Sequence, residues 1–391
     1  MNDRIRVLQV IPSLCSGGAE RMVLHLAAGL DRSRYEASVA CLGDPLGTDL
    51  EQTAREADIP VRYLGKKAGF DWRAYPQLEG LLRELKPTVV HIHLNALLYA
   101  APVANFRRVR AMVYTAHNFP ELLVPARLRW FYRMCFHCGV VPVSISGALT
   151  PALREEFRVK SMPLIPNGIP VGRFSRPEVA FTDWRRREGF ADSDFLFVCV
   201  ARLSPQKNHE LLLRAFGALC EMGGDAHLLL AGEGELRAPL MRLTEELGIA
   251  SRVRFLGNRS DISALLAASN VFVLSSAQEA NPLCVMEAMA AGLPIVSTRV
   301  GGVPDIVDSR VHGLLTEPGG VASLAQAMSV MMLNPRLRRE CGRRAYERAR
   351  DRFDLSRMVD AYDQLYCNLL AVESKSVGEM PKCTIQSELH I

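Results

Sequence analysis

Long hydrophobic runs are missing from this 391-residue sequence. No stretch comes near the roughly 20 apolar residues that a membrane-spanning helix needs, so we expect no transmembrane segment. The apolar run at the N-terminus, Ile5–Ile11, ends at Pro12 and Ser13 and is too short for a secretory signal. These absences predict a cytoplasmic protein that is soluble or lies on the inner face of the plasma membrane.

An excess of charge of one sign is also missing. The sequence has 47 basic and 42 acidic residues, which leaves a net charge of +5. Nucleic-acid-binding domains carry a dense basic stripe, so this balance argues against a nucleic-acid partner. It permits an anionic ligand or an anionic membrane surface.

Regularly spaced cysteines are missing too. The ten cysteines follow no pattern, and a chain with a large core needs no disulfides, which favours free thiols in a reducing cytoplasm. Cys135, His137 and Cys138 have the spacing of zinc ligands, but a tetrahedral site needs four and no second pair lies nearby. We therefore expect no metal site and interpret these cysteines as small buried residues on a helix.

What the chain does contain is a soluble composition, 49% hydrophobic and 23% charged, over a length that favours two domains. Short apolar segments alternate with amphipathic ones, which indicates parallel, doubly wound sheets. The first series of expected strands is 6–11, 35–41, 61–64, 89–93, 111–115 and 140–144.

A cluster of prolines and glycines between Pro163 and Pro170 breaks this alternation and reads as a domain boundary. The alternation then restarts, which predicts a second Rossmann-like domain. Its expected strands are 195–200, 227–231, 253–256, 271–274 and 294–297. The chain is expected to be helical from about residue 321 to 371, with apolar residues of its last helix at Met358, Val359, Tyr362, Leu365, Tyr366 and Leu369.

Chemistry is expected in the loops that follow strands, because open α/β sheets bind ligands at the carboxyl ends of their strands. Gly17 and Gly18 follow the first strand, where glycines let a backbone approach a ligand; a plain tight turn is the alternative. Arg202 and Lys207 follow the strand at 195–200 and can bracket a diphosphate; two solvated surface cations are the alternative.

The most informative loop follows the strand at 271–274. Glu279 lies in this loop and Glu287 on the helix behind it, and two carboxylates suit the hydroxyls of a sugar and a ribose. Free amides at the helix start, residues 283–285, can meet a phosphate. The alternative is an ordinary helix with an acid near its N-terminus, which the helix dipole favours.

Several less specific glycine-containing turns follow other strands. The order of all these motifs along the chain resembles that of glycosyltransferase family 4. The resemblance covers about residues 5 to 370 and rests most on the pair of glutamates with seven residues between them. The motifs that carry it are Gly17-Gly18, Arg202 with Lys207, Gly232-x-Gly234, Glu279-x7-Glu287-Ala288, Gly292-Leu293-Pro294 and Gly301-Gly302-Val303-Pro304.

The resemblance implies a GT-B fold, in which two Rossmann-like domains face each other across a cleft. The implied domains are residues 1–168 for the acceptor and 169–354 for the donor, with helix 355–371 rejoining the first domain. A flexible tail is expected at 373–391.

The resemblance also implies roles for single residues. The implied catalytic residues are Arg202, Lys207, Glu279 and His117. The two cations would neutralise the departing diphosphate, and Glu279 would hold the transferred sugar. His117 would lie on the acceptor side; a structural loop histidine is the alternative. Glu287 would hold the ribose. The other implied donor contacts are Gly17, Gly18, Gly232, Leu283, Cys284 and Val285. The implied acceptor-side residues are Glu20, Asn118, Arg129 and Arg133.

Four positions depart from the family pattern. Ala201 and Asn208 replace usual glycines, Asp305 stands where glutamate is common, and Pro170 stands where an aspartate often follows the Asn-Gly turn. None removes a charge from the expected diphosphate site, so they bear on donor details rather than on the reaction type.

The expected reaction is retaining transfer of a hexose or N-acetylhexosamine from a UDP- or GDP-sugar. Fixed cations and helix amides can stabilise a departing diphosphate in place of a metal, so neither metal nor cofactor is expected. Retention points to a phosphate oxygen that takes the acceptor proton, with no protein nucleophile.

The acceptor is expected to be a glycan or lipid-linked saccharide of bacterial surface polysaccharide synthesis. The basic and aromatic stretch from Arg127 to Phe136 suits a membrane interface, and an amphipathic helix with a solvated face is the equal alternative. The rival functions are a catalytically silent nucleotide-sugar scaffold or sensor, an epimerase or phosphorylase of the same fold, and a solute-binding protein.

Overall fold

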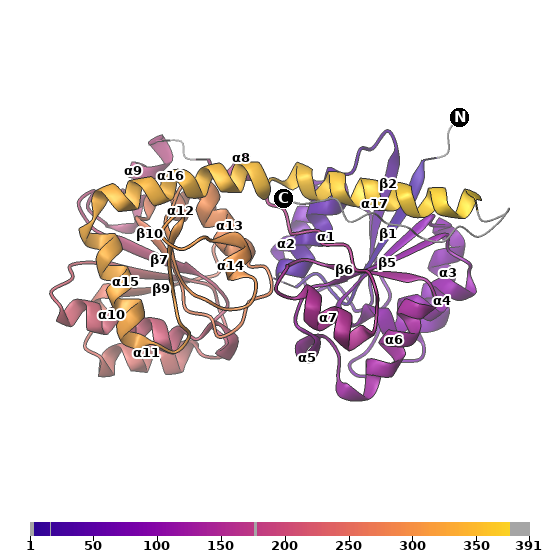
Figure 1. Cartoon of the computed structure of the whole chain (residues 1–391), viewed down its shortest axis with the longest axis horizontal. Coiled ribbons are helices and arrows are strands. Elements are labelled where there is room, and N and C mark those ends of the chain that lie inside the picture. The colour runs from indigo at the N-terminus through magenta and orange to yellow at the C-terminus, as the bar shows by residue number, and fades with distance from the viewer. Residues whose placement is uncertain (1–3, 16, 176–177, 376–391) are drawn as a thin grey trace.

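The structure, a computed structural model, describes residues 4–15, 17–175 and 178–375 and contains two parallel six-stranded sheets side by side (Figure 1). The first sheet has the strand order β3-β2-β1-β4-β5-β6. Its strands are β1 Ile5–Ile11, β2 Tyr35–Cys41, β3 Val61–Tyr63, β4 Val89–His93, β5 Ala111–Ala116 and β6 Val140–Ser144. The sequence predicted all six, because strands buried on both faces form continuous apolar runs.

The second sheet has the order β12-β11-β10-β7-β8-β9. If β7 to β12 are renumbered 1 to 6, this is the strand order of the first sheet read in the opposite direction. Its strands are β7 Leu196–Val200, β8 His227–Ala231, β9 Val253–Gly257, β10 Val271–Leu274, β11 Ile295–Thr298 and β12 Gly313–Thr316. The sequence did not predict β12. This strand has only four residues and begins with a glycine, so it shows too short an apolar run to be recognised. Gly313 is needed there because a Cβ atom would lie 1.8 Å from the Ile295 carbonyl oxygen.

Helices cover both faces of each sheet (Figure 1). Those of the first half are α1 Gly18–Gly29, α2 Asp49–Glu56, α3 Ala74–Leu85, α4 Leu97–Phe106, α5 Pro120–Leu123, α6 Arg129–His137 and α7 Thr150–Phe157. Those that follow are α8 Val171–Phe174, α9 Glu178–Glu188, α10 His209–Glu221, α11 Arg237–Glu246, α12 Ile262–Ala268, α13 Leu283–Ala290, α14 Val303–Ile306, α15 Val321–Leu333, α16 Pro335–Arg352 and α17 Leu355–Lys375.

Helix α17 packs on the first sheet although it follows the second in the chain (Figure 1). Met358, Val359, Tyr362 and Tyr366 are buried in one cluster with residues of β1, β4 and β5, as the apolar repeat of this helix predicted. Gly29 of α1 makes room for this contact, because a Cβ atom there would lie 2.5 Å from a Val359 methyl group. Of the expected tail at 373–391, residues 376–391 lie outside the described residues.

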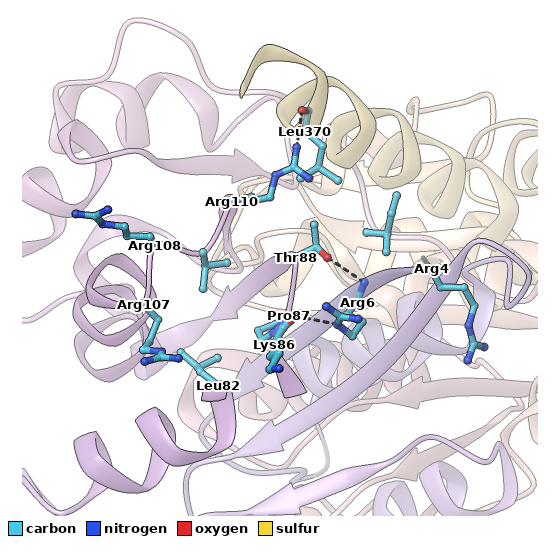
Figure 2. A pocket seen from close by; sticks show the side chains of 12 residues that line it. Arg4, Arg6, Leu82, Lys86, Pro87, Thr88, Arg107, Arg108, Arg110 and Leu370 are labelled. Atoms are coloured by element: carbon cyan, nitrogen blue, oxygen red, sulfur yellow. Dashed lines mark hydrogen bonds between the residues drawn. The ribbon is translucent and has the colours of Figure 1, made fainter. Parts of the chain in front are cut away.

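A basic cavity of about 420 Å³ opens at the amino ends of β1, β4 and β5, at the edge opposite the strand ends where ligands are expected (Figure 2). Two of the arginines that line it donate hydrogen bonds to backbone carbonyl oxygens. Arg6 donates to the Lys86 carbonyl oxygen over 2.8 Å, and Arg110 donates to the Leu370 carbonyl oxygen over 3.2 Å. We interpret this cavity as the closed amino edge of the sheet. In the described part of the chain, no helix is both long and apolar enough to cross a membrane.

Candidate active site between the two sheets

Two loops of the second half, residues 201–208 after β7 and 275–282 after β10, are bonded to each other. The Ala277 amide donates to the Gln206 carbonyl oxygen over 2.9 Å, and the Gln206 side chain donates to the Gln278 carbonyl oxygen over 3.0 Å. Ser275 donates to the Asn208 carbonyl oxygen over 2.9 Å. These bonds fix the two loops, which carry Arg202, Lys207 and Glu279, relative to one another.

Lys207 and Glu279 form an ion pair at the centre of these loops. The Lys207 Nζ atom lies 2.5 Å from the Glu279 Oε1 atom, which also accepts from the Ser276 hydroxyl over 2.6 Å. Burial of the Lys207 amine lowers its pKa, but the charge and hydrogen bond of Glu279, together with the nearby Cys284 and Cys199, leave that pKa raised. The structure thus brings together two predicted site residues, with the lysine charged and its partner carboxylate 5% exposed.

Glycines shape the backbone around this pair. A Cβ atom at Gly301 would lie 1.9 Å from the Glu279 carbonyl oxygen, and one at Gly302 would lie 1.9 Å from that of Ala280. A Cβ atom at Gly232 would similarly lie 2.1 Å from the Ala201 carbonyl oxygen. The family's glycine motifs therefore allow close backbone contact between neighbouring loops, and Gly232 supports the loop that holds Arg202.

Glu287 meets a residue that the sequence did not single out. Arg21 of α1 reaches across from the first half of the chain and donates to the Glu287 Oε1 atom over 3.0 Å. The Oε2 atom is buried and has no hydrogen-bond partner among the described residues. Burial raises the Glu287 pKa, while Arg21 and Arg173 oppose this rise. Arg21 could have been noticed as a cation in the first turn of a helix, where the dipole disfavours it.

The start of α1 faces the second half of the chain. Gly18 lies against Leu283, whose Cδ1 atom would be 3.7 Å from an added Cβ atom. The Glu20 carboxylate folds over Gly17, burial raises its pKa, and the Arg202 charge acts in the opposite direction. The structure therefore brings Gly18 against Leu283 and places Glu20 within reach of the Arg202 charge, although Ser16 of this turn lies outside the described residues.

His117 follows β5 and is 9% exposed. Its Nε2 atom lies 2.9 Å from the Nδ1 atom of His93, and burial lowers the His117 pKa to about 3, so both rings are neutral at pH 7. Asn118, the next residue, accepts a hydrogen bond from the Phe119 amide over 3.0 Å and so supports the loop.

Further contacts join the two halves of the chain. Asp305 of α14 accepts from the Ser146 hydroxyl over 2.6 Å and from the Ala148 amide over 3.1 Å. The Asn167 amide donates to the Asn281 side chain over 3.1 Å. The departure from the family pattern at Asp305 thus serves a contact between the two halves.

Among the expected phosphate-binding amides of α13, that of Val285 donates to the Pro282 carbonyl oxygen over 3.2 Å. The amides of Leu283 and Cys284 belong to the first turn, which has no partners within its own helix. These two are therefore the amides available to a ligand at this position.

Arg129 and Arg133 lie together on α6, and both contact Glu156 of α7, at 3.3 Å and 3.1 Å. Both guanidinium groups are thus paired with a carboxylate of the first half of the chain. Large apolar side chains are exposed in this region beside Arg127 and His137, with Trp130 63% and Met134 45% exposed.

The only Asp-x-Asp triplet in the sequence is Asp192-Ser193-Asp194. It precedes β7, at the amino end of the second sheet, and the backbone oxygens of Asp192 and Asp194 accept hydrogen bonds from Arg185. Across residues 4–15, 17–175 and 178–375, no group of three His, Cys, Asp or Glu side chains could hold a metal ion.

Two sheets of identical strand order that meet at such a site define the GT-B fold, and solved structures agree. A crystal structure of Anabaena HepE in complex with UDP and glucose superposes with a TM-score of 0.84. The two chains are 23% identical, and the match covers 93% of this chain and 100% of the other.

Family models match both halves of the chain. The model of glycosyltransferase family 4 matches residues 16–173, and that of glycosyl transferases group 1 matches residues 180–348. This chain belongs to glycosyltransferase family 4 and is an enzyme that transfers a sugar from a nucleotide sugar.

Two relatives match over most of their length. The Escherichia coli UDP-Gal:α-D-GlcNAc-diphosphoundecaprenol α-1,3-galactosyltransferase is 25% identical over 94% of this chain and 97% of its own. The lipopolysaccharide core biosynthesis glycosyltransferase LpsE of Rhizobium meliloti is 28% identical over 89% of this chain and 95% of its own.

Proposed function

We propose that this enzyme is a retaining, metal-independent transferase that moves a hexose or N-acetylhexosamine from a UDP-sugar to a lipid-linked saccharide. The observation that carries the proposal is the Lys207–Glu279–Ser276 cluster on the loops that also hold Arg202, opposite the start of α1. The names of the E. coli relative and of the HepE complex favour UDP over GDP as the nucleotide.

In this proposal the cations act on the leaving group. Negative charge develops on the diphosphate as the sugar bond breaks, and fixed cations stabilise it without reorganisation. Lys207 is charged and held by Glu279, so it can turn to a phosphate oxygen when the Glu279 carboxylate engages sugar hydroxyls. Arg202 supplies the second charge from the same loop.

The nucleotide is assigned to Glu287. Its Oε2 atom is buried without a partner, while Arg21 holds Oε1. An unsatisfied buried carboxylate oxygen is costly, and a ribose hydroxyl can donate to it. The first-turn amides of Leu283 and Cys284 can then receive a phosphate oxygen.

The acceptor is assigned to the first half of the chain, in bacterial surface polysaccharide synthesis, as the names of both relatives suggest. The exposed apolar side chains Leu122, Trp130 and Met134, on α5 and α6, suit the interface of the inner membrane. Arg129 and Arg133, bonded to Glu156, orient this helix rather than contact lipid.

The test is calorimetric titration of UDP, GDP and ADP in the presence of EDTA, followed by turnover with the matching nucleotide sugars. We expect UDP to bind most tightly and its affinity to fall at least 10-fold in the Arg202→Ala/Lys207→Ala double variant, since hydrogen bonds to charged groups contribute about 1.5–3 kcal/mol each. The exposed Lys160→Ala variant is the control. Loss of activity on adding EDTA would contradict metal independence, and tight UDP binding without turnover would instead indicate a silent scaffold.

A further inference from the structure

A chain of buried side chains runs from His117 into the first sheet. His117 Nε2 lies 2.9 Å from His93 Nδ1, and His93 Nε2 lies 2.7 Å from Gln9 Oε1. Gln9 and His93 are completely buried and lie on the neighbouring strands β1 and β4, and the Gln9 Nε2 atom has no hydrogen-bond partner among the described residues. Two imidazoles and an amide inside an apolar sheet are costly unless they hydrogen-bond, so this arrangement calls for a function.

A second arm of the same network reaches α17. His91 contacts the Tyr366 hydroxyl at 2.6 Å and the Thr115 hydroxyl at 2.7 Å, and Thr115 contacts the Tyr362 hydroxyl at 2.8 Å. This arm joins the C-terminal helix to the first sheet. Its hydrogen bonds are buried like those of the first arm, but none of them involves His117. A variant in this arm can therefore serve as a control for a variant in the first arm.

The chemistry of the three groups sets the direction of each bond. As the Gln9 amide is placed in the structure, its Oε1 atom faces His93 Nε2 and can only accept, so in this orientation the proton of His93 is on Nε2. His93 is neutral because burial holds its pKa well below the usual range, which leaves Nδ1 without a proton. Nδ1 must then accept, and His117 must donate from Nε2. The Nδ1 atom of neutral His117 is consequently a bare acceptor.

We propose that His93 and Gln9 are positioning residues for the transfer reaction, which hold His117 as its Nε2-protonated tautomer so that Nδ1 accepts a hydrogen bond from a hydroxyl of a bound sugar. The inference rests on the proposed transferase function and on the acceptor-side role that the family resemblance implies for His117. An unprotonated Nδ1 atom accepts from a sugar hydroxyl but repels a ligand atom that can only accept. The opposite tautomer of His117 would place an N–H donor at the same position.

The decisive measurement is the tautomer of His117 in the ligand-free protein, read from long-range ¹H–¹⁵N spectra of ¹⁵N-histidine-labelled chain. The His117 signals are assigned by their absence in His117→Asn. We expect the proton on Nε2 in the wild type. In Gln9→Leu, where His93 loses its acceptor, the protons of both rings move to Nδ1.

Activity should follow the tautomer. We expect kcat of Gln9→Leu to fall about 10- to 100-fold, the usual effect of losing a group that orients a functional histidine, with little change in the donor KM. Tyr362→Phe removes one hydrogen bond from the other arm. It should lower thermal stability by a similar amount but leave the His117 tautomer and kcat at wild-type values.

A wild-type spectrum with the His117 proton on Nδ1 would overturn the inference without any variant being needed. An unchanged tautomer in a folded Gln9→Leu protein would overturn the role of Gln9. Nε2-protonated His117 in a chain that turns over no nucleotide sugar would uphold the assignment while the proposed function fails, so the two failures are distinguishable.

Discussion

At the scale of single residues, the site depends on two buried glutamates that meet cations in different ways. Glu279 pairs with Lys207 inside the second half of the chain, whereas Glu287 pairs with Arg21 from the first half. Desolvation offsets much of the attraction within buried ion pairs, so they stabilise a fold weakly. We therefore interpret both pairs as contacts that orient buried carboxylates rather than as a source of stability.

The Arg21–Glu287 pair leads to a prediction about pH. In Arg21→Met, Glu287 loses a charge that opposes the rise of its pKa caused by burial, so the carboxyl takes up a proton more readily. Because a protonated Glu287 accepts hydrogen bonds poorly, we expect UDP affinity to fall about 10-fold at neutral pH. The loss should grow as the pH is lowered from 9 to 6, as followed by calorimetry.

The control for this prediction is Arg62→Met, which removes an exposed arginine whose partner Glu84 lies 3.8 Å away. Its UDP affinity should match that of the wild type at every pH. Wild-type affinity of Arg21→Met at pH 6 would show that Glu287 does not contact the nucleotide in its ionised form.

At the scale of elements, the loop after β11 supports the loop after β10. The Gly302 amide donates to the Glu279 carbonyl oxygen over 2.9 Å, and the missing side chain of Gly302 leaves room for Ala280. The position of Glu279 is therefore set by a glycine that makes no contact of its own with a ligand in the proposed mechanism.

We predict that Gly302→Ala lowers both stability and activity. The added Cβ atom would lie 1.9 Å from the Ala280 carbonyl oxygen and 2.7 Å from the Ser146 hydroxyl, so the backbone must shift. Overpacking of this kind costs about 1–3 kcal/mol, measured by urea unfolding, and kcat should fall with it. Gly80→Ala in α3 is the control, since nothing lies within 4 Å of its Cβ position.

Helix propensity favours alanine over glycine by up to about 1 kcal/mol, so Gly80→Ala should be neutral or stabilising. Equal unfolding midpoints for the two variants would show that the loop after β11 adapts freely and does not position Glu279.

Some elements escaped prediction for physical reasons. The helix α4, Leu97–Phe106, is apolar on nearly all sides and contains Pro102, so it lacks the 3.6-residue period that identifies a half-exposed helix. The strand β12 is short and begins at a glycine. The remaining strands were predicted because each is a short, nearly continuous apolar run, and α17 because its apolar residues repeat at the helical interval.

At the scale of the whole molecule, polar contacts join the two halves of the chain. Asp305 accepts from Ser146 in a half-buried contact, and the Asn281 side chain accepts from the buried Asn167 amide. A few hydrogen bonds between two halves can break at low cost, which suits an enzyme that opens to admit a nucleotide sugar and then excludes water.

Buried histidines predict how the whole fold responds to acid. Burial lowers the pKa of His25 and of His209 to about 4 and that of His117 to about 3, so in the folded state they stay neutral where the unfolded chain is protonated. The unfolded state then binds more protons, and stability falls as the pH drops from about 6.5 toward 4. The loss is at most about 3 kcal/mol per histidine, because one pKa unit corresponds to 1.36 kcal/mol.

Urea unfolding between pH 7 and pH 4 measures this loss. The matched variant is His209→Gln, which removes one buried titrating group, so its midpoint should fall less steeply with acid than that of the wild type. Parallel pH profiles for the two proteins would contradict the assignment of His209 as a neutral buried histidine.

The sequence by itself determined the two α/β halves, the break near Pro166 and the loops that carry Arg202, Lys207 and Glu279. These depend on local periodicity and on the rule that ligands bind at the carboxyl ends of parallel strands. A strand or a turn leaves its mark within a few residues, so a single sequence suffices to find it.

Only the tertiary structure decided which residues meet. Arg21 and Glu287 are 266 positions apart, Ser146 and Asp305 are 159, and Gln9 and His93 are 84. No local pattern records such contacts, because they arise only when strands far apart in the chain assemble into a sheet and the two sheets pack together. That assembly placed a cation beside Glu287 and a second imidazole beside His117, which the sequence could name but not bring together.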